Sequence, residues 1–119
     1  MTIGIHHLHV KTKNPKATMQ FYVENLGATV IAELPDGSYR VRLDGLQMNI
    51  TGLIGTQTRE QKYGLEHVAV ETDDYTGTLA RFRANGARVL EELPPGGNGR
   101  RVGFVEAPDG VQVEIIEKV

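Results

Sequence analysis

The feature that most constrains this chain is an internal repeat, in which both halves carry similar short segments in the same order. The segment His7–Thr12 reappears in the second half as His67–Thr72. A later segment, Asp44–Ile50, reappears as Asp109–Ile115, and the interval between its copies is only slightly longer. Self-similarity at a nearly constant spacing indicates that one supersecondary unit is used twice. The chain is therefore two copies of one unit, each about half of its length.

Alternation of apolar and polar residues and the signals for helix ends predict the same order of elements, βαβββ, in both halves. A helix is expected after the N-cap pair Asn14-Pro15, ending at Gly27, and a second one over 75–85 after Asp73-Asp74. The strands expected in the first half span 3–11, 28–34, 38–43 and 46–51. In the second half, the first strand is expected to begin at residue 65, and the other three are expected to span 88–93, 101–106 and 111–117.

These elements predict an α+β fold of two tandem βαβββ modules, which form a curved mixed sheet around a metal-binding cavity. The 119 residues are expected to form a single domain over 1–119. Its first module covers about 1–54, a polar, glycine-containing linker about 52–64, and the second module about 64–119. Pairing of the modules within one chain and exchange of modules across a dimer both remain open.

Composition excludes several classes of protein. The 13 Lys and Arg residues against 15 Asp and Glu residues give a net charge of −2, which argues against a nucleic-acid or membrane-surface binder. No apolar run approaches the ~18 residues of a membrane span. Neither a signal peptide nor a cysteine is present, so we expect a cytoplasmic protein without disulfides. Because only 39% of the residues are hydrophobic, we also expect a homodimer that buries further apolar surface.

Polar side chains collect on one face of the expected strands. Successive side chains of a strand point to opposite faces, so His7 and His9 share one face while Leu8 and Val10 share the other. The same reasoning groups the remaining polar residues opposite the apolar ones: Gln47 and Asn49 in the first module, and His67, Gln112 and Glu114 in the second. The helices are expected to cover the apolar faces, which leaves the polar faces to line a cavity.

A histidine on a strand is usually a packed or solvated residue, but four features favour a metal site here. His7 and His67 occupy equivalent repeat positions, as do Asn49 and Glu114, and all four lie on the polar faces. Moreover, an enclosed carboxylate is costly unless it is paired or bound to a cation. Two imidazoles and one carboxylate suit Fe(II), and with a further oxygen ligand they suit Zn, Ni, Mn or Co. Asn49 is either a weak fourth ligand or a hydrogen-bonding partner of the substrate.

Two motifs give the chain a resemblance to a known family. The segments Phe21–Gly27 and Phe104–Glu117 resemble the vicinal oxygen chelate superfamily, which includes glyoxalase I, methylmalonyl-CoA epimerase, extradiol dioxygenases and the fosfomycin and bleomycin resistance proteins. The resemblance implies paired βαβββ modules and a divalent metal held by His7, His67 and Glu114. At the fourth ligand position, where glyoxalases and epimerases have Glu, Gln or His, this chain has Asn49.

The resemblance implies a divalent-metal-dependent lyase or isomerase of glyoxalase type, acting on a small substrate with two adjacent oxygens. The alternatives are a Fe(II)-dependent extradiol-type dioxygenase and a metal-free ligand-binding protein of the bleomycin-resistance kind. His9, together with Glu114, is the expected catalytic residue, although His9 could instead only shape the cavity wall. Residues Gln47, Asn49 and Gln112 are the expected substrate contacts. His6 faces away from His7 and is excluded from the site.

Overall fold

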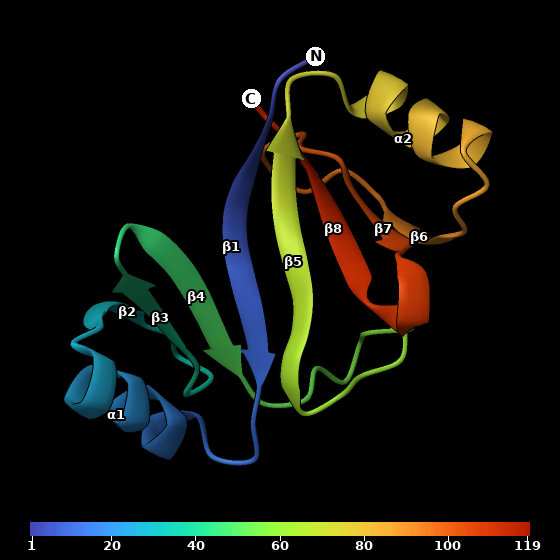
Figure 1. The fold of residues 1–119 in the computed structure, drawn as a ribbon. Coiled ribbons are helices and arrows are strands. Elements are labelled where there is room, and N and C mark those ends of the chain that lie inside the picture. The colour runs from blue at the N-terminus through green and yellow to red at the C-terminus, as the bar shows by residue number, and fades with distance from the viewer. The chain divides into compact units, whose positions relative to one another are not determined.

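The computed structural model describes residues 1–119 and contains two βαβββ modules in tandem (Figure 1). The first comprises β1 (Ile3–Lys11), α1 (Pro15–Leu26), β2 (Thr29–Glu33), β3 (Tyr39–Leu43) and β4 (Leu46–Thr51). The second comprises β5 (Gly64–Thr72), α2 (Tyr75–Ala84), β6 (Val89–Leu93), β7 (Val102–Glu106), the short 3₁₀ turn η1 (Pro108–Gly110) and β8 (Gln112–Glu117). The α+β class and the repeated βαβββ order are thus confirmed.

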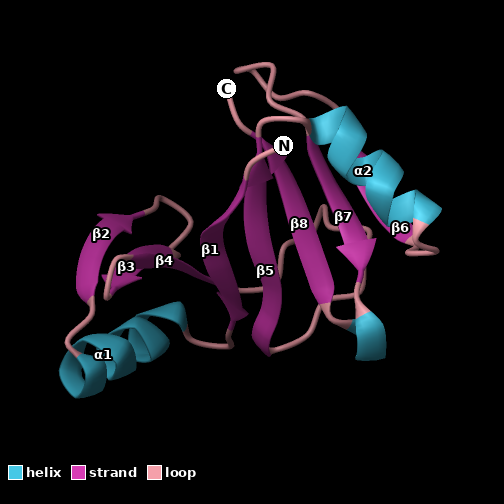
Figure 2. Ribbon diagram, turned by 45° about the horizontal axis from the view of Figure 1, so that its top comes forward, coloured by secondary structure: helices cyan, strands magenta, loops and turns pink.

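Each module contains a four-stranded mixed sheet with the same connectivity. In the first module the order is β2-β3-β4-β1, where β1 and β4 are parallel and the other pairs are antiparallel. In the second module the order is β6-β7-β8-β5, where β5 and β8 are parallel. Figure 2 shows the strands of each sheet with the helix of the same module. In both modules the first and last strands therefore lie side by side, which brings their polar residues together.

Helix α1 begins and ends where the sequence predicts. The Asn14 side chain accepts a hydrogen bond from the backbone N–H of Ala17 (3.1 Å), and Pro15 occupies the first turn. Gly27 terminates the helix in the left-handed region with φ 73°, which glycine adopts without steric cost. The apolar face of the helix packs on the core of the first module, which consists of Val10, Ala28, Tyr39, Val41, Met48 and Ile50.

Helix α2 repeats this design in the second module. The Asp74 side chain accepts a hydrogen bond from the backbone N–H of Gly77 (3.0 Å), so the predicted acidic cap is confirmed. The core between the helix and the sheet consists of Tyr75, Leu79, Val105 and Ile115, with Phe82, Val70 and Val113 packed against it. Leu79 and Phe82 therefore pack on the apolar side of β8, which leaves its other side for polar residues.

A polar network fastens α2 to the strands next to it. The hydroxyl of Tyr75 donates to Glu92 Oε1 (3.1 Å), and the guanidinium of Arg101 lies 4.7 Å from the centroid of the Tyr75 ring. Arg101 also donates to both carboxylate oxygens of Glu117, at 3.1 and 2.7 Å. Burial, followed by the hydrogen bond to Glu92, raises the pKa of Tyr75 to about 12. This network is structural, and it includes none of the predicted site residues.

The chain groups into two compact units whose boundaries fall inside β1 and just after the start of β5. One unit contains residues 7–66, and the other contains 1–6 together with 67–119. Within the latter unit, residues 1–6 are joined to residues 67–119 by a hydrogen bond from the backbone N–H of Thr2 to Asp73 Oδ1 (2.8 Å). No helix here combines the length and the apolar character needed to cross a membrane.

A few local expectations need correction. Helical periodicity predicts Leu26 on the buried face of α1, but Leu26 is the last residue of the helix and is 54% exposed. The flanking strands β2, β3, β6, β7 and β8 each begin one residue later than predicted. Asp44 and Gly45 form the tight turn between β3 and β4, with φ of 49° and 79°, as a two-residue hairpin requires.

Candidate metal centre

The first group of predicted site residues lies on β1. His7 and His9 are buried, at 5% and 8% exposure, although both are polar and lie in mid-strand. Strand alternation turns Leu8 and Val10 to the opposite side, where they contact the core under α1. The centroids of the two imidazole rings are 6.3 Å apart. Both rings therefore occupy the polar face of the first sheet, as predicted.

Two amide side chains on β4 accompany these histidines. The parallel register sets His7 opposite Gln47 and His9 opposite Asn49. Gln47 Nε2 donates a hydrogen bond to Asn49 Oδ1 at 2.8 Å. The carbonyl oxygen of Asn49 is thus already engaged by a neighbouring donor, which favours a hydrogen-bonding role over metal ligation for this residue.

The hydrogen bonds around His9 define which of its nitrogens carries the proton. The hydroxyl of Thr51 donates to the backbone carbonyl of Gly52 (2.8 Å) and lies 2.8 Å from His9 Nε2. A hydroxyl has a single hydrogen, so Thr51 Oγ1 accepts the second bond and His9 Nε2–H donates it. In the neutral ring the lone pair is then on Nδ1. This arrangement orients His9 as a base or a ligand through Nδ1.

The second group of predicted site residues lies on β5 and β8. His67 Nε2 is 3.1 Å from Glu114 Oε1, and the Glu114 side chain is 14% exposed. The ring of Phe104, on the adjacent β7, meets the His67 ring edge-on at a centroid distance of 5.5 Å. The Phe104 ring thus packs against a buried imidazole that is paired with a carboxylate.

Strand register confirms that the two modules place their polar residues equivalently. His67 lies opposite Gln112 on β8, as His7 lies opposite Gln47 on β4. Glu114 lies one step further along β8, as Asn49 does along β4. Gln112 is buried, at 4% exposure. The spacing of the sequence repeat therefore corresponds to structural equivalence.

The spacing of His67 and Glu114 is compatible with a shared metal. Nitrogen and oxygen ligands about 2.1 Å from one ion, at right angles, are ~3.0 Å apart. The observed 3.1 Å between His67 Nε2 and Glu114 Oε1 fits that separation, and it also fits a direct hydrogen bond between a protonated Nε2 and the carboxylate. Both groups are hard or borderline donors of the kind that Zn, Fe, Ni, Co and Mn accept.

Sequence reasoning missed Lys11, the next residue on the face of β1 that carries His7 and His9. Its side chain is fully buried, and Nζ donates to Gln57 Oε1 (2.9 Å) and Gln61 Oε1 (2.7 Å) and pairs with Glu66 Oε2 at 3.8 Å. Burial lowers the pKa of Lys11, and the Glu66 charge opposes that shift. Strand alternation already placed Lys11 on the polar face, so the signal was present in the sequence.

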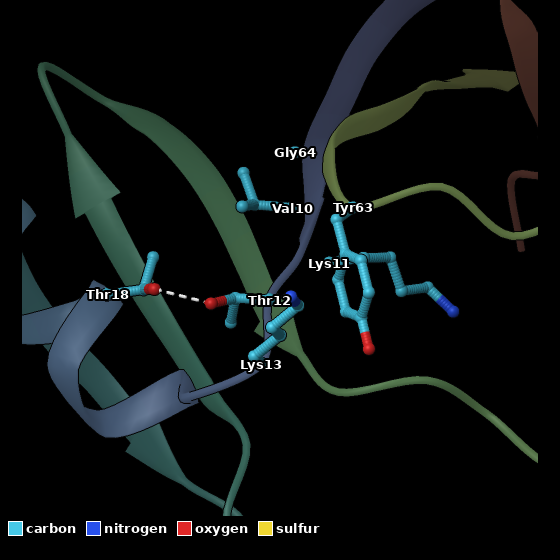
Figure 3. A pocket seen from close by; sticks show the side chains of 7 residues that line it. All are labelled: Val10, Lys11, Thr12, Lys13, Thr18, Tyr63 and Gly64. Carbon is cyan, nitrogen blue, oxygen red and sulfur yellow. Dashed lines mark hydrogen bonds between the residues drawn. The ribbon is translucent and has the colours of Figure 1, made fainter.

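A pocket of ≈ 380 Å³ lies at the end of β1 (Figure 3). Thr12 and Thr18 join their hydroxyls across it at 2.7 Å, and the ammonium of Lys13 lies 5.5 Å from the centroid of the Tyr63 ring. Its lining residues are Val10, Lys11, Thr12, Lys13, Thr18, Tyr63 and Gly64. None of the predicted ligands or substrate contacts lines this pocket.

Comparison with known proteins identifies relatives of two kinds. A probable lactoylglutathione lyase from Synechocystis sp. is 26% identical over 93% of this chain and 92% of its own length. A methylmalonyl-CoA epimerase from Streptomyces coelicolor, solved with 2-nitronate-propionyl-CoA, is 26% identical with a TM-score of 0.63, covering 97% of this chain and 96% of its own. The relatives are thus lyases and epimerases.

The fold and the family follow from two further matches. A hypothetical protein from Bacillus halodurans superposes with a TM-score of 0.76 at 19% identity, covering 100% of this chain and 96% of its own, which is a likeness of fold alone. The model of the glyoxalase/bleomycin resistance protein/dioxygenase superfamily matches residues 4–115. This chain therefore belongs to the glyoxalase/bleomycin resistance protein/dioxygenase superfamily.

Proposed function

We propose that this protein is a divalent-metal-dependent lyase or isomerase of glyoxalase type, acting on a small substrate with two adjacent oxygens. The proposed metal ligands are His7, His67 and Glu114. The observation that carries the proposal is the distance of 3.1 Å between Nε2 of the buried His67 and Oε1 of Glu114. The position of His67 in the repeat is equivalent to that of His7, which is a second buried imidazole.

The buried polar groups support a cation more than an apolar ligand. Imidazoles and carboxylates lose hydration when they are buried, and a cation among them compensates for that loss. A divalent ion held there would polarise the substrate oxygens and stabilise negative charge that develops on them. The rest of the reaction must be carried by side chains of the protein.

His9 is the proposed base. The bond from its Nε2–H to Thr51 leaves the lone pair on Nδ1, so a proton taken from substrate carbon would go to that atom. The amide pair Gln47-Asn49 on β4 and Gln112 on β8 are proposed to bind substrate oxygens through hydrogen bonds. A carboxamide N–H donates to a carbonyl oxygen of the substrate, and a carboxamide C=O accepts from a hydroxyl.

The names of the relatives support proton transfer next to a carbonyl. Lactoylglutathione and methylmalonyl-CoA are both thioesters, and each bears a C–H bond on the carbon beside the thioester carbonyl. Epimerisation at that carbon requires removal and return of the proton. We therefore propose a small acyl thioester, or a compound that isomerises to one, as the substrate class.

Hydrogen exchange tests this proposal without knowledge of the natural substrate. Protein reconstituted separately with Zn, Ni, Co, Mn or Fe(II) is incubated with lactoylglutathione or methylmalonyl-CoA in D₂O, and loss of the C–H signal is followed by proton NMR. We expect metal-dependent exchange with at least one pair. His9→Gln should slow exchange at least about 100-fold while metal content stays unchanged.

The matched control is His6→Gln, which alters the neighbouring histidine on the opposite side of β1. It should leave exchange within about twofold of the unmodified protein. The absence of exchange with every metal, or equal loss in His6→Gln and His9→Gln, would contradict the proposal. Oxygen uptake with catechol under Fe(II) would instead support a dioxygenase, and failure to bind any metal would support a metal-free ligand-binding protein.

A further inference from the structure

The pocket at the end of β1 lies entirely within one compact unit, residues 7–66. Figure 3 shows Thr18 of α1 on one side of it and Tyr63 on the other, with Val10 and Thr12 between them. Its volume of ≈ 380 Å³ is in the range of cavities that hold small molecules, about 300–1,000 Å³. The proposed reaction uses none of the side chains that line it, so the pocket has no role there.

The repeat provides an internal reference for this pocket, because Thr12 and Thr18 correspond to Thr72 and Thr78. Both pairs join their hydroxyls, at 2.7 Å in the first module and 2.8 Å in the second. Thr72 and Thr78 are buried, at 0% and 1% exposure, whereas Thr12 and Thr18 are partly exposed. The same pair of hydroxyls is therefore covered in the second module and lines an open pocket in the first.

A change of residue type accounts for this difference between the modules. In the second module Asp73 Oδ1 accepts from the backbone N–H of Thr2 (2.8 Å), and the Asp73 N–H donates to the Thr2 carbonyl (3.3 Å). The repeat sets Lys13 at the position of Asp73, and an ammonium group cannot accept such a bond. Lys62, at the position of Thr2, instead donates its backbone N–H to Glu66 Oε2 (3.3 Å). The first module thus lacks the closing contact.

The first module also retains a hydroxyl hydrogen that the second module uses internally. The Thr78 hydroxyl donates to the carbonyl of Asp74 (2.7 Å), so the Thr72 hydroxyl donates to Thr78 Oγ1 and both hydrogens are engaged. Thr18 forms no equivalent bond from its hydroxyl to a backbone carbonyl. The bond between Thr12 and Thr18 uses one of their two hydrogens, and the other can be donated to a ligand in the pocket.

We infer that this pocket binds a small aromatic carboxylate, at a site distinct from the proposed metal ligands. The ammonium of Lys13, 5.5 Å from the centroid of the Tyr63 ring, supplies the cation, and no acidic residue lines the pocket. One ammonium and one hydroxyl hydrogen match the two oxygens of a carboxylate. The Tyr63 ring and Val10 offer apolar contact to the remainder of the ligand. The Lys11 ammonium is already engaged by its buried partners and is not counted.

Benzoate, benzamide and acetate test the inference. Benzamide has the shape of benzoate without its charge, and acetate has the charge without the ring. Each is titrated into isotope-labelled protein, and the chemical shifts of the backbone amides are followed by NMR. We expect benzoate to shift the amides of Thr12, Lys13 and Gly64 in a saturable manner. Benzamide and acetate should each bind at least about fivefold more weakly than benzoate.

Two variants assign the polar contacts. Lys13→Met removes the charge but keeps the aliphatic stem, and it should weaken benzoate about three- to fivefold, as expected for an exposed ion pair. Thr18→Val removes one hydroxyl with little change of shape and should weaken benzoate at least about threefold. Lys16→Met is the matched control, because Lys16 is an exposed lysine of α1 that does not line the pocket. It should leave the affinity within about twofold.

Three results would overturn the inference. They are the absence of benzoate-induced shifts at these amides, equal affinity for benzoate and benzamide, and an equal effect of Lys13→Met and Lys16→Met. Shifts confined to the amides around His7 and His67 would assign benzoate to the proposed metal centre and would also overturn it. Because none of these measurements requires a bound metal, their failure leaves the proposed function untouched, and failure of metal binding leaves this inference untouched.

Discussion

The most demanding prediction concerns Lys11, whose ammonium is buried among groups contributed by the segment between the modules. Lys11→Met keeps most of the aliphatic volume and removes the charge. Two hydrogen bonds of 2.9 and 2.7 Å and an ion pair of 3.8 Å to Glu66 are lost together. The Glu66 side chain is only 1% exposed, so its carboxylate loses this ammonium partner inside the protein.

The expected loss of unfolding free energy in Lys11→Met is the balance of opposing contributions. Removing one partner of a buried ion pair typically costs about 3–5 kcal/mol. Removing the ammonium also relieves the desolvation that lowers the pKa of Lys11, and Gln61 Oε1 still accepts from the backbone N–H of Ile54 at 2.7 Å. We therefore expect the low end, a loss of about 3 kcal/mol of unfolding free energy. At roughly 4 °C per kcal/mol, Tm falls by about 12 °C.

Urea unfolding at pH 7, followed by circular dichroism, measures this loss. Lys16→Met, at an exposed lysine of α1, is the control and should change the unfolding free energy by less than about 0.5 kcal/mol. Adding Glu66→Gln to Lys11→Met should restore at least about 1 kcal/mol, because the second change removes the carboxylate charge that the first left without its lysine. If Lys11→Met lowers the unfolding free energy no more than Lys16→Met does, the buried ammonium of Lys11 does not stabilise the protein.

The lowered pKa of Lys11 also predicts the direction in which its contribution to stability changes with pH. Between the pKa of Lys11 in the folded protein and its ordinary value of 10.5, the unfolded chain holds more protons at this residue than the folded one. The contribution of Lys11 to stability therefore rises with pH across that window and is complete above 10.5. The Lys11→Met protein should lack this rise, and an identical pH profile in the two proteins would refute the assignment.

Three further predictions concern single contacts. Ultraviolet titration should find one phenol that ionises near pH 12, and this transition should be absent in Tyr75→Phe. Because folding raises the pKa of Tyr75, its contribution to stability should be lost as pH rises from 10.0 to about 12. Gly103→Ala should cost about 1–2 kcal/mol in urea unfolding, since a Cβ there would lie 2.7 Å from the Tyr75 hydroxyl, and a neutral result would show that the ring can move. Thr51→Val should slow the exchange reaction about tenfold by releasing His9, with metal content unchanged; an unaffected rate would mean that this hydrogen bond does not orient the base.

The repeat made most of the fold predictable from sequence. Equivalent segments at nearly constant spacing required two similar modules, and local signals at Asn14 and Gly27 located the ends of α1. Strand alternation then placed His7 and His67 on faces opposite the cores, because a period of two admits only one such assignment. The expected homodimer and the cytoplasmic location stay predictions.

What the sequence could not supply depends on contacts between segments without periodicity. Strand alternation places Lys11 on the polar face, but it does not identify the partners Gln57 and Gln61, which come from the irregular segment after β4. The bond between His9 and Thr51 likewise depends on the register of two strands separated by a helix and a hairpin. Such side-chain pairs follow from three-dimensional placement, whereas patterns along the chain report only which face a residue occupies.

The amount of divalent metal bound per chain tests the central claim most directly. Elemental analysis of protein reconstituted with Zn and then dialysed should find one ion per chain, because ligands from both modules are proposed to share it. His7→Ala and His67→Ala should each lose that ion, whereas His6→Ala should retain it. Retention of a full equivalent in His7→Ala, or two ions per chain in the unmodified protein, would contradict a single metal shared by the two modules.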